Sequence, residues 1–479
     1  MTVTSAIPAR LDRLPWSRFH TLVVVALGIT WLLDGLEVTL VGAISGVLED
    51  PRTLHLSPGQ IGAVASFYLT GAVAGALLFG WMTDRWGRHR MFYITLAVYL
   101  AGVALSAFAW SYGSFALFRA LTGAGIGGEY AAINSAIDEL MPARLRGRLD
   151  LAINGTYWLG AAAGAGATVV LLDPRWFAVN IGWRLGFFMG AALGVFILLL
   201  RRLLPESPRW LLVHGRAAEA EAVMAGIEST IARERGAPLP TLTDPAVELH
   251  PRGPIGLAVV FGAMLGDYRA RAGLAFALMV SQAFLYNALF FTYALILTRF
   301  YGVGAGRAGI YLLPLAAGNF LGPLLLGRWF DTWGRRVMIA GTYLLSAVLL
   351  ALAGWLFAQG WLTATTQTVA WAVVFFFASA AASSAYLTAS EIFPLEMRAL
   401  ALACFYAIGT AVGGIVAPWL FGTLIGIGTR SYIFAGYLAA AVLMAAAAVI
   451  ALRWGVDAEG RALEAVAAPL SAVRRAALE

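Results

Sequence analysis

The sequence has little charge and almost no cysteine. Only 12% of its 479 residues are Asp, Glu, Lys or Arg, 60% are hydrophobic, and the mean hydropathy is +0.78. A soluble domain carries about 25% charged residues, so this composition excludes a soluble enzyme and a nucleic-acid-binding protein. The single Cys404 cannot form an intrachain disulfide, which excludes a disulfide-stabilised secreted scaffold. An integral membrane protein remains.

Lysine is absent, so all 33 basic residues are arginine. A phosphate-binding loop of the Gly-x-x-x-x-Gly-Lys kind therefore cannot occur, and ATP-driven transport is excluded. The five histidines lie mainly in loops and tails, with no spacing that indicates a metal site. No paired nucleophile and base is visible. We therefore predict no enzyme activity, no cofactor and no metal.

Long apolar runs recur along the chain, and a membrane-spanning helix needs about 20 apolar residues. We predict twelve such helices, at 21–45, 58–83, 91–110, 115–138, 149–172, 184–204, 273–300, 308–329, 337–358, 367–390, 399–424 and 431–452. They divide the chain into a tail (1–20), a six-helix bundle (21–204), a linker with short helices (205–272), a second six-helix bundle (273–452) and a second tail (453–479). The predicted fold is an all-α membrane protein.

The arginines predict the orientation of these helices. Most lie in the two tails, the linker and the loops of one side, whereas Arg119 falls inside a helix and six lie in or beside the opposite loops: Arg52, Arg175, Arg184, Arg299, Arg307 and Arg430. Loops rich in Arg stay in the cytoplasm. We therefore expect a multi-pass protein of the inner (plasma) membrane with both termini cytoplasmic. Topology then explains the basic charge without any nucleic-acid partner.

Two short motifs occur once in each half of the chain. Residues 80–90 read GWMTDRWGRHR, and residues 327–336 read GRWFDTWGRR, 247 positions later. A glutamate followed seven positions later by an arginine occurs at Glu139 and Arg146, and again, 252 positions on, at Glu391 and Arg398. Two motif pairs in the same order at nearly the same offset indicate duplication of a six-helix unit.

The charges of these motifs predict a gate on the cytoplasmic side. Asp84 near a helix end can accept hydrogen bonds from the N-terminus of an opposing helix, whose dipole favours an anion. Arginine–glutamate pairs between neighbouring helices can be bidentate. The alternative is a set of basic loops that only fixes the topology. Because Thr332 replaces an arginine in the second copy, we expect a weaker contact there. The predicted gate residues are Asp84, Arg85, Arg88, Glu139, Arg146, Asp331, Arg335, Glu391 and Arg398.

With these motifs the chain resembles the major facilitator superfamily over nearly its whole length, and within it the sugar porters. Arg119 opens helix 4 four positions before Gly123, residues 205–210 read PESPRW after helix 6, and residues 457–464 read DAEGRALE after helix 12. The Gly-Gly-Glu ending at Glu129 looks more like metabolite–proton symporters. The resemblance implies two pseudo-symmetric six-helix bundles, a solute site between them and alternating access.

Two acids on helix 1 are candidates for proton coupling. Asp34 and Glu37 stand three positions apart and share a helix face. Two neighbouring carboxylates in a low dielectric repel each other and lose hydration, which favours protonation of one of them near neutral pH. The resemblance implies that Glu37 takes the place of the coupling aspartate of proton-coupled sugar porters and that Arg119 is its partner. The alternative is a buried ion pair that only fixes helix packing.

Polar residues in several helices are candidates for binding the solute. The resemblance implies that Gln282 and Asn287 of helix 7 bind solute hydroxyls. Asn154 and Tyr386 stand where sugar porters carry glutamine and tryptophan, and Tyr293 is a further candidate. Glu129 is either a solute or proton ligand or a partner of a neighbouring helix. Tyr157, Trp158 and Asn319 are weaker candidates, since any one aromatic residue can simply pack. Residues 383–385 lack the prolines and glycine of the sugar-porter motif, so a hexose fits less well.

We therefore predict a secondary transporter that moves a small polar organic solute by proton symport. The nearest alternative keeps the fold without the coupling, as a facilitative uniporter or an antiporter. A second alternative is a membrane sensor that binds solute without moving it. The central acids favour a neutral or cationic solute. The expected partners are the solute, protons and the lipid bilayer, and a monomer is expected to suffice.

Overall fold

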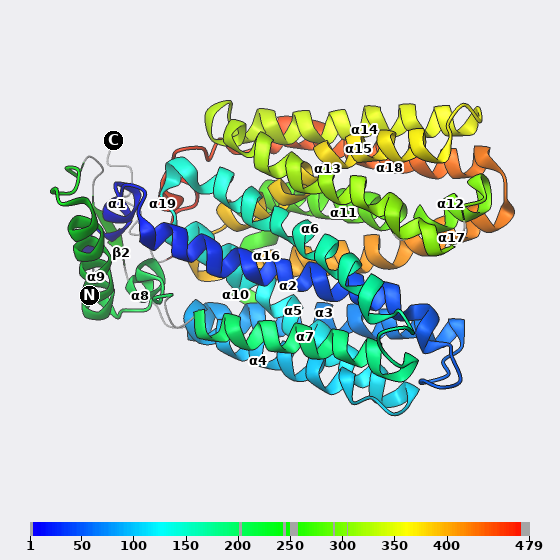
Figure 1. Ribbon diagram of the computed structural model, residues 1–479. Helices are drawn as coiled ribbons and strands as arrows, with labels where there is room; N and C mark the ends of the chain where they lie inside the picture. The colour runs from blue at the N-terminus through cyan, green and yellow to red at the C-terminus, as the bar shows by residue number, and fades with distance from the viewer. Residues whose placement is uncertain are drawn as a thin grey trace.

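The computed structural model describes residues 3–200, 204–242, 246–249, 257–290, 293–303 and 305–470. Its long helices form two bundles that lie side by side (Figure 1). The first bundle, the N half, contains six membrane-length helices, one for each span predicted there. They are α2 (Arg18–Leu48), α3 (Pro58–Trp86), α4 (Arg88–Ala107), α5 (Tyr112–Leu140), α6 (Arg146–Leu171) and α7 (Val179–Leu200).

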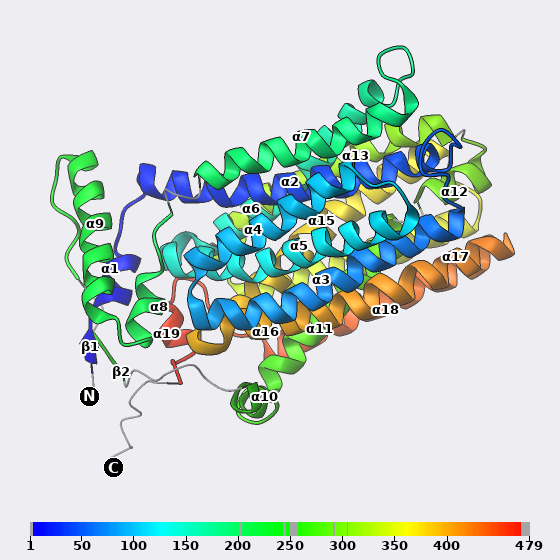
Figure 2. The same ribbon diagram turned by 90° about the horizontal axis from the view of Figure 1, so that it is seen from below.

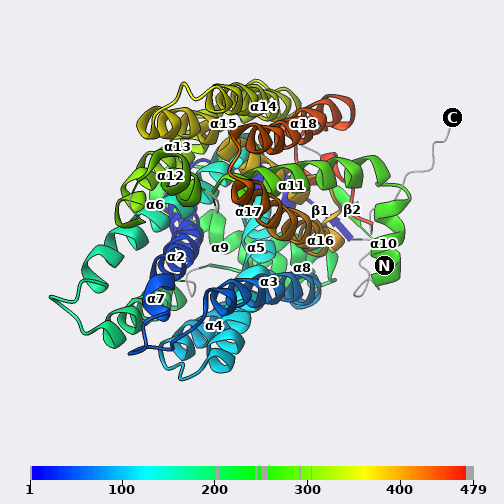
Figure 3. The same cartoon turned by 90° about the vertical axis from the view of Figure 1, so that its right-hand side faces the viewer.

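The second bundle, the C half, supplies the other six spans. Four are single helices: α13 (Ala305–Thr332), α14 (Arg335–Ala358), α15 (Ala364–Glu391) and α18 (Arg430–Trp454). The seventh span consists of α11 (Arg269–Phe290) and α12 (Tyr293–Tyr301), and the eleventh of α16 (Arg398–Ala411), a π-helical segment (Val412–Val416) and α17 (Ala417–Ile427). Figure 3 shows α14, α15 and α18 on the far side of the molecule from α4 and α7.

Nine of the described helical stretches are long and apolar enough to cross a membrane by composition alone. Helices α5 and α6 do not meet that criterion, and within α7 only the shorter apolar stretch Val179–Val195 is found. Helix α5 carries Arg119, Glu129, Asp138 and Glu139, and α6 begins with RGRLD. Charges inside a span are rare and mark function. In α5 and α6, weak membrane character thus coincides with buried charge, and α2 adds the buried Asp34 and Glu37.

The short elements gather at one end of the bundles, named here the tail end (Figures 1 and 2). They include α1 (Ile7–Asp12), α8 (Pro208–Val213), α9 (Ala217–Arg235) and α19 (Leu463–Val466), with 3₁₀ turns at Ala143–Leu145 and Leu395–Met397. Helix α10 (Leu257–Leu265) precedes α11. Strand β1 (Val3–Ser5) pairs antiparallel with β2 (Val247–Leu249). This small sheet is the one departure from the predicted all-α fold within the described residues.

The first tail packs on the linker. Ile7, Leu11 and Leu14 lie in one apolar cluster with residues of α8 and α9. Glu228 of α9 pairs with Arg10 at 2.6 Å and with Arg13 at 2.5 Å. The two arginines lower the pKa of Glu228, although its burial works in the opposite direction. Tail and linker, predicted as separate segments, thus form one packed layer across the tail end.

Glycines set the distance between helices within the N half. A Cβ atom added at Gly160 of α6 would lie 1.7 Å from the carbonyl oxygen of Leu32 in α2, and one at Gly71 of α3 would lie 2.0 Å from that of Ala120 in α5. Small residues allow such close backbone approach in lipid. Gly87 and Gly334 have φ angles of 94° and 103° and form the one-residue turns that follow α3 and, after Trp333, α13. L side chains rarely adopt this conformation.

We expect Gly160→Ala to lower the free energy of unfolding by about 1–3 kcal/mol, because the new methyl group would push α2 and α6 apart. Gly166→Ala on the same helix is the matched control, since a Cβ there meets nothing within 4 Å. Thermal unfolding of the two purified variants measures the difference. Equal unfolding temperatures would contradict the close contact of α2 and α6.

Candidate functional site

The tail end is closed by two contacts of the same design. In the first latch, Asp84 at the end of α3 accepts hydrogen bonds from the backbone N–H groups of Ala399 (3.2 Å) and Leu400 (2.9 Å) in the first turn of α16. The helix N-terminus offers unpaired N–H groups and a favourable dipole to this anion. The first latch joins the N half to the C half.

The second latch is the repeat copy of the first. Asp331 of α13 accepts hydrogen bonds from the backbone N–H groups of Gly147 (3.1 Å) and Arg148 (2.8 Å) at the start of α6. Arg335 also donates to Asp331 at 2.8 Å. The duplication seen in the sequence thus places one aspartate from each half on a helix N-terminus of the other half.

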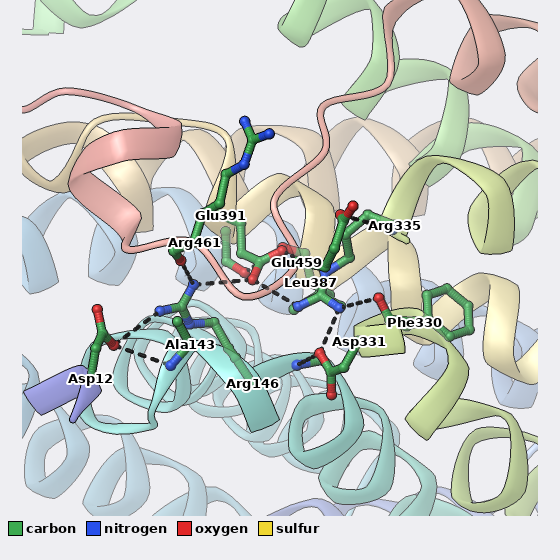
Figure 4. Close-up of polar contacts among 12 residues, drawn as sticks. Asp12, Ala143, Arg146, Phe330, Asp331, Arg335, Leu387, Glu391, Glu459 and Arg461 are labelled. Carbon is green, nitrogen blue, oxygen red and sulfur yellow. Dashed lines mark hydrogen bonds and ion pairs between the residues drawn. The ribbon is translucent and has the colours of Figure 1, made fainter. Parts of the chain in front are cut away.

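Buried ion pairs accompany the latches, and Figure 4 shows those around the second latch. Arg88 pairs with Glu139 at 2.7 Å, and Arg335 makes a bidentate pair with Glu391 at 3.0 and 3.1 Å. Arg146 of the N half reaches Glu391 of the C half at 3.3 Å. Arg398 lies 3.7 Å from Glu139. We call this set the gate network; it comprises four acids and four arginines, namely Asp84, Arg88, Glu139, Arg146, Asp331, Arg335, Glu391 and Arg398.

Further acids extend the gate network to the tails. Glu206 accepts the backbone N–H of Arg88 at 3.0 Å, and Glu459 accepts that of Arg335 at 3.1 Å, so each caps the helix that follows a latch. Burial raises the pKa of Glu206. Arg209 of α8 pairs with Asp12 at 3.1 Å and with Glu464. Burial opposes the charge of Arg209, but these two acids raise its pKa.

Arg85 does not belong to the gate network, which corrects the prediction. Its side chain is exposed and its guanidinium lies over the ring of Trp81, 4.5 Å from the ring centre. The motif places Arg85 beside Asp84, and consecutive helical positions do not share a face. Its loss at Thr332 in the second copy therefore removes no latch contact, and the second latch has as many backbone hydrogen bonds as the first.

A cavity of about 250 Å³ lies between the two halves. Four of the six residues predicted to bind solute line it: Asn154, Gln282, Asn287 and Tyr386. Tyr157 and Trp158, the weaker candidates, line it too. Asn319 is buried behind the wall and accepts a hydrogen bond from the hydroxyl of Tyr286 at 2.5 Å.

Aromatic rings from both halves make up much of the wall. Trp31 of α2 stacks on Tyr130 of α5, with 4.5 Å between ring centres. Tyr130 meets Tyr406 of α16 edge-on at 5.0 Å, and Tyr386 of α15 lies 6.0 Å from Trp31. These four rings bridge the halves. The other aromatic residues of the wall are Tyr68, Tyr157, Trp158 and Tyr286.

The two acids of α2 lie directly behind this wall. Glu37 pairs with Arg119 of α5, and both side chains are buried. The guanidinium of Arg119 also lies over the ring of Tyr68, 4.7 Å from its centre. Asp34 accepts a hydrogen bond from the hydroxyl of Tyr130. Asp34 is thus one aromatic side chain away from the cavity, and Glu37 is connected to it through Arg119 and Tyr68.

Two predicted solute ligands lie elsewhere. Tyr293 begins α12, packs on Trp371 with 4.9 Å between ring centres and bonds to Thr368, so it belongs to the core of the C half. Glu129 is buried on α5, outside the residues that line the cavity, and its charge interacts with that of Asp34.

The sequence reasoning missed Tyr68, Tyr130 and Tyr406 of the wall. A tyrosine hydroxyl within a membrane span is a sign of a polar neighbour. That sign does not say which face of the helix meets the cavity, because lipid-facing and core-facing positions are equally apolar.

Comparisons with known proteins agree with this architecture. Residues 39–467 match the family model described as "Sugar (and other) transporter". The niacin transporter NiaP of Acinetobacter baylyi is 24% identical over 460 residues, which cover 96% of this chain and 99% of that protein. The 4-hydroxybenzoate transporter PcaK of the same organism is 25% identical over 445 residues and 93% of each chain.

Solved structures share the fold. The major facilitator superfamily proton:xylose symporter XylE bound to 6-bromo-6-deoxy-D-glucose superposes with a TM-score of 0.76 at 18% identity, over 94% of this chain and 98% of that one. The partially occluded inward-open form of XylE from E. coli gives 0.65 at 18% identity, over 90% and 97%. With twelve helices in two repeated halves and a family match over most of its length, the chain belongs to the sugar (and other) transporter family of the major facilitator superfamily.

Proposed function

We propose that this transporter couples the uptake of a small polar organic solute to proton entry. The observation that carries the proposal is the position of two buried acids behind the cavity wall: Asp34 contacts the wall residue Tyr130 directly, and Glu37 is connected to the wall residue Tyr68 through Arg119. A solute that moves Tyr68 or Tyr130 changes the surroundings of an acid. Protonation of that acid in turn changes the wall. This reciprocity between two ligands is what coupled transport requires.

In the proposed cycle, the Glu37–Arg119 pair holds α2 against α5 while no proton is bound. Protonation of Glu37 removes its charge, so the pair loses its Coulomb attraction and Arg119 keeps its contact with Tyr68. The N half can then rotate against the C half, and the latches at the tail end separate. Return of the empty carrier needs the proton to leave Glu37 first, which links the two fluxes.

The wall also indicates the kind of solute. Eight aromatic side chains surround the amides of Asn154, Gln282 and Asn287 and the hydroxyls of Ser379 and Ser383. Flat apolar faces with a few directed hydrogen-bonding groups suit a small ring-bearing solute with polar substituents. The names of the niacin and 4-hydroxybenzoate relatives support such a solute, while the XylE neighbour supports a polyhydroxylated one.

We infer that the tail end faces the cytoplasm and that the membrane is the inner (plasma) membrane. The arginine-rich tails and loops gather at the tail end, and such loops stay in the cytoplasm. Each chain carries both halves of the cavity, so a monomer suffices for transport. Uniport or antiport would keep the fold but leave Glu37 a structural ion pair, and a sensor would bind solute without moving it.

The coupling role predicts that Glu37→Gln, which imitates the protonated acid, abolishes uphill accumulation but spares exchange of labelled for unlabelled solute. Exchange needs no proton release. Uptake driven by an imposed pH gradient and counterflow, both measured in the same proteoliposomes, separate the two activities. Asp34→Asn is the companion variant and should have the milder effect. Proton-driven accumulation that persists in Glu37→Gln would rule out Glu37 as the coupling acid.

The gate role predicts that Asp84→Asn slows transport strongly while the protein still folds and inserts. Asparagine keeps the shape but offers the start of α16 a weaker acceptor without charge. Arg85→Gln, an adjacent change outside the gate network, should transport at close to the normal rate. Initial rates of counterflow at matched protein amounts compare the two. Normal turnover in Asp84→Asn would leave these loops with a topological role alone.

The cavity predicts that Gln282→Ala and Asn287→Ala each weaken solute affinity about 2- to 12-fold, because each removes a hydrogen bond worth about 0.5–1.5 kcal/mol. Ser346→Ala is the matched control, since this buried C-half hydroxyl bonds to Thr342 and lies outside the cavity lining. A thermal-shift screen against aromatic acids, amino acids, polyols and sugars identifies a binder first. Unchanged affinity in both variants would place the solute site elsewhere.

A further inference from the structure

Two buried acids beside the gate network have no part in the contacts described so far. Asp138 of α5 and Asp150 of α6 are both 0% exposed. The gate network is already balanced, with four acids and four arginines. Asp138 and Asp150 are therefore surplus negative charges at the same depth of the molecule, unless they carry protons.

Their oxygen atoms are poorly satisfied. Within the described residues, both carboxylate oxygens of Asp138 and Oδ1 of Asp150 have no hydrogen-bond partner. Oδ2 of Asp150 accepts from the amide of Asn154 at 3.0 Å. An ionised carboxylate that is buried without partners is strongly disfavoured and takes up a proton instead. The closed gate thus stabilises the neutral form of this acid pair.

The surroundings of the pair fit a protonated acid. Ser390 of α15 lies beside Asp138, and its hydroxyl donates to the carbonyl of Leu387 at 2.9 Å, which leaves its oxygen able to accept. Asp138 and Asp150 also interact with each other. The charged groups that face the pair from its own and neighbouring helices are Glu139, Arg146, Arg335, Glu391 and Arg398, all members of the gate network.

The repeat shows that this pair is not a duplicated part of the gate. At the offset of 252 residues that relates Glu139 to Glu391, the counterpart of Asp138 is Ser390 and that of Asp150 is Leu402. The C half therefore has two arginines and two acids in the network, whereas the N half has two arginines and four acids. The surplus belongs to the N half alone.

This asymmetry matters when the halves separate. In the closed gate Arg146 of the N half pairs across the interface with Glu391 of the C half at 3.3 Å. Opening removes Glu391, and Arg146 stays on the N half with Asp12 at 3.9 Å, where Asp138 is also near enough for its charge to interact with that of Arg146. Water also enters. Both changes favour the ionised form of Asp138.

We propose that Asp138 and Asp150 form a proton-binding site that is occupied while the tail-end gate is closed and that releases its proton to the cytoplasm as the gate opens. On opening, the ion pair of Arg146 with Glu391 breaks, and Arg146 pairs with Asp138 instead. The O–H bond of the acid breaks, the proton passes to water, and the carboxylate takes the guanidinium as its new partner. The direction of release depends on the proposed cytoplasmic orientation of the tail end.

The site is also connected to the cavity. Asn154 lines the cavity wall and donates to Asp150, and its own carbonyl oxygen has no partner among the described residues. A solute that bonds to Asn154 pulls on the amide that holds Asp150. Solute in the cavity and protons at the gate thus act on one side chain.

The sign of the pH dependence follows from linkage. The closed gate binds one more proton than the open gate, so a rise in cytoplasmic pH favours opening, and a fall favours closure. For one released proton, the equilibrium constant for opening changes about tenfold per pH unit between the two titration ranges. In a gate without such a site, this release does not contribute to the change of the opening equilibrium with pH.

Distances between spin labels at Arg90→Cys of α4 and Thr332→Cys of α13, both exposed at the tail end, measure gate opening without any solute. The background carries Cys404→Ala, so that only the introduced cysteines react, and Glu37→Gln, so that the proposed coupling proton cannot contribute. We expect the open population to rise with pH from 5 to 9. In Asp138→Asn/Asp150→Asn the equilibrium constant for opening should lose this change of about tenfold per pH unit. Asp173→Asn, at a half-buried loop acid that pairs with Arg175 on the opposite side, should leave the slope unchanged.

Infrared difference spectra supply a second test that does not depend on gate opening. The closed protein at neutral pH should show the carbonyl band of a protonated carboxylic acid, and Asp138→Asn/Asp150→Asn should lose it. An unchanged pH slope in the double variant, or no change in that band, would overturn the proposal. Neither measurement uses transport, so both stay informative if Glu37 proves not to couple, and loss of coupling in Glu37→Gln does not by itself support this site.

Discussion

A charge buried away from water needs a counter-charge, and this constraint organises the tail end of the molecule. Each half contributes buried arginines and acids, and its own helices supply only some of the partners that these charges need. The two aspartates of the latches find helix N-termini in the opposite half, and Arg146 finds Glu391 there. In the closed arrangement each acid of the gate network has a protein partner, although some N–H groups of Arg146 and Arg398 have none among the described residues. In the proposed cycle, opening lets water replace the same partners.

The same constraint connects the cavity to the protons. Arg119 lies inside a membrane span, and Glu37 supplies the charge that makes its burial tolerable. When Glu37 is neutralised, Arg119 loses the charge of its partner and keeps its contact with the ring of Tyr68, which lines the cavity. In the proposed cycle, a proton on Glu37 and a solute in the cavity both change the position of the same side chain, Tyr68. A proton relay across the membrane is not needed for coupling of this kind.

The sequence was sufficient for the fold and for most of the gate, because run length, arginine position and repeated motifs are local signals. It was insufficient wherever the face of a helix mattered. Arg85 was assigned to the gate from its place in a motif, although its side chain points outward. Tyr293 was assigned to the cavity, although its ring packs on Trp371 in the core of the C half. Tyr130 and Tyr406 were missed because a membrane helix is apolar on all faces, so its periodicity does not mark the wall.

Duplication gave the two halves the same latches, but the remaining polar residues are divided unequally. The acids that can respond to protons, Glu37 and Asp34, lie in the N half with Arg119, and the amides Gln282 and Asn287 lie in the C half. A carrier with identical halves would respond to a proton and a solute in the same way on both sides of its cavity. In the proposed cycle, protonation loosens contacts within the N half, while amides of both halves, Asn154 together with Gln282 and Asn287, hold the solute. Symmetry supplies the two latches of the tail end, and in the proposed cycle the departures from symmetry supply the coupling.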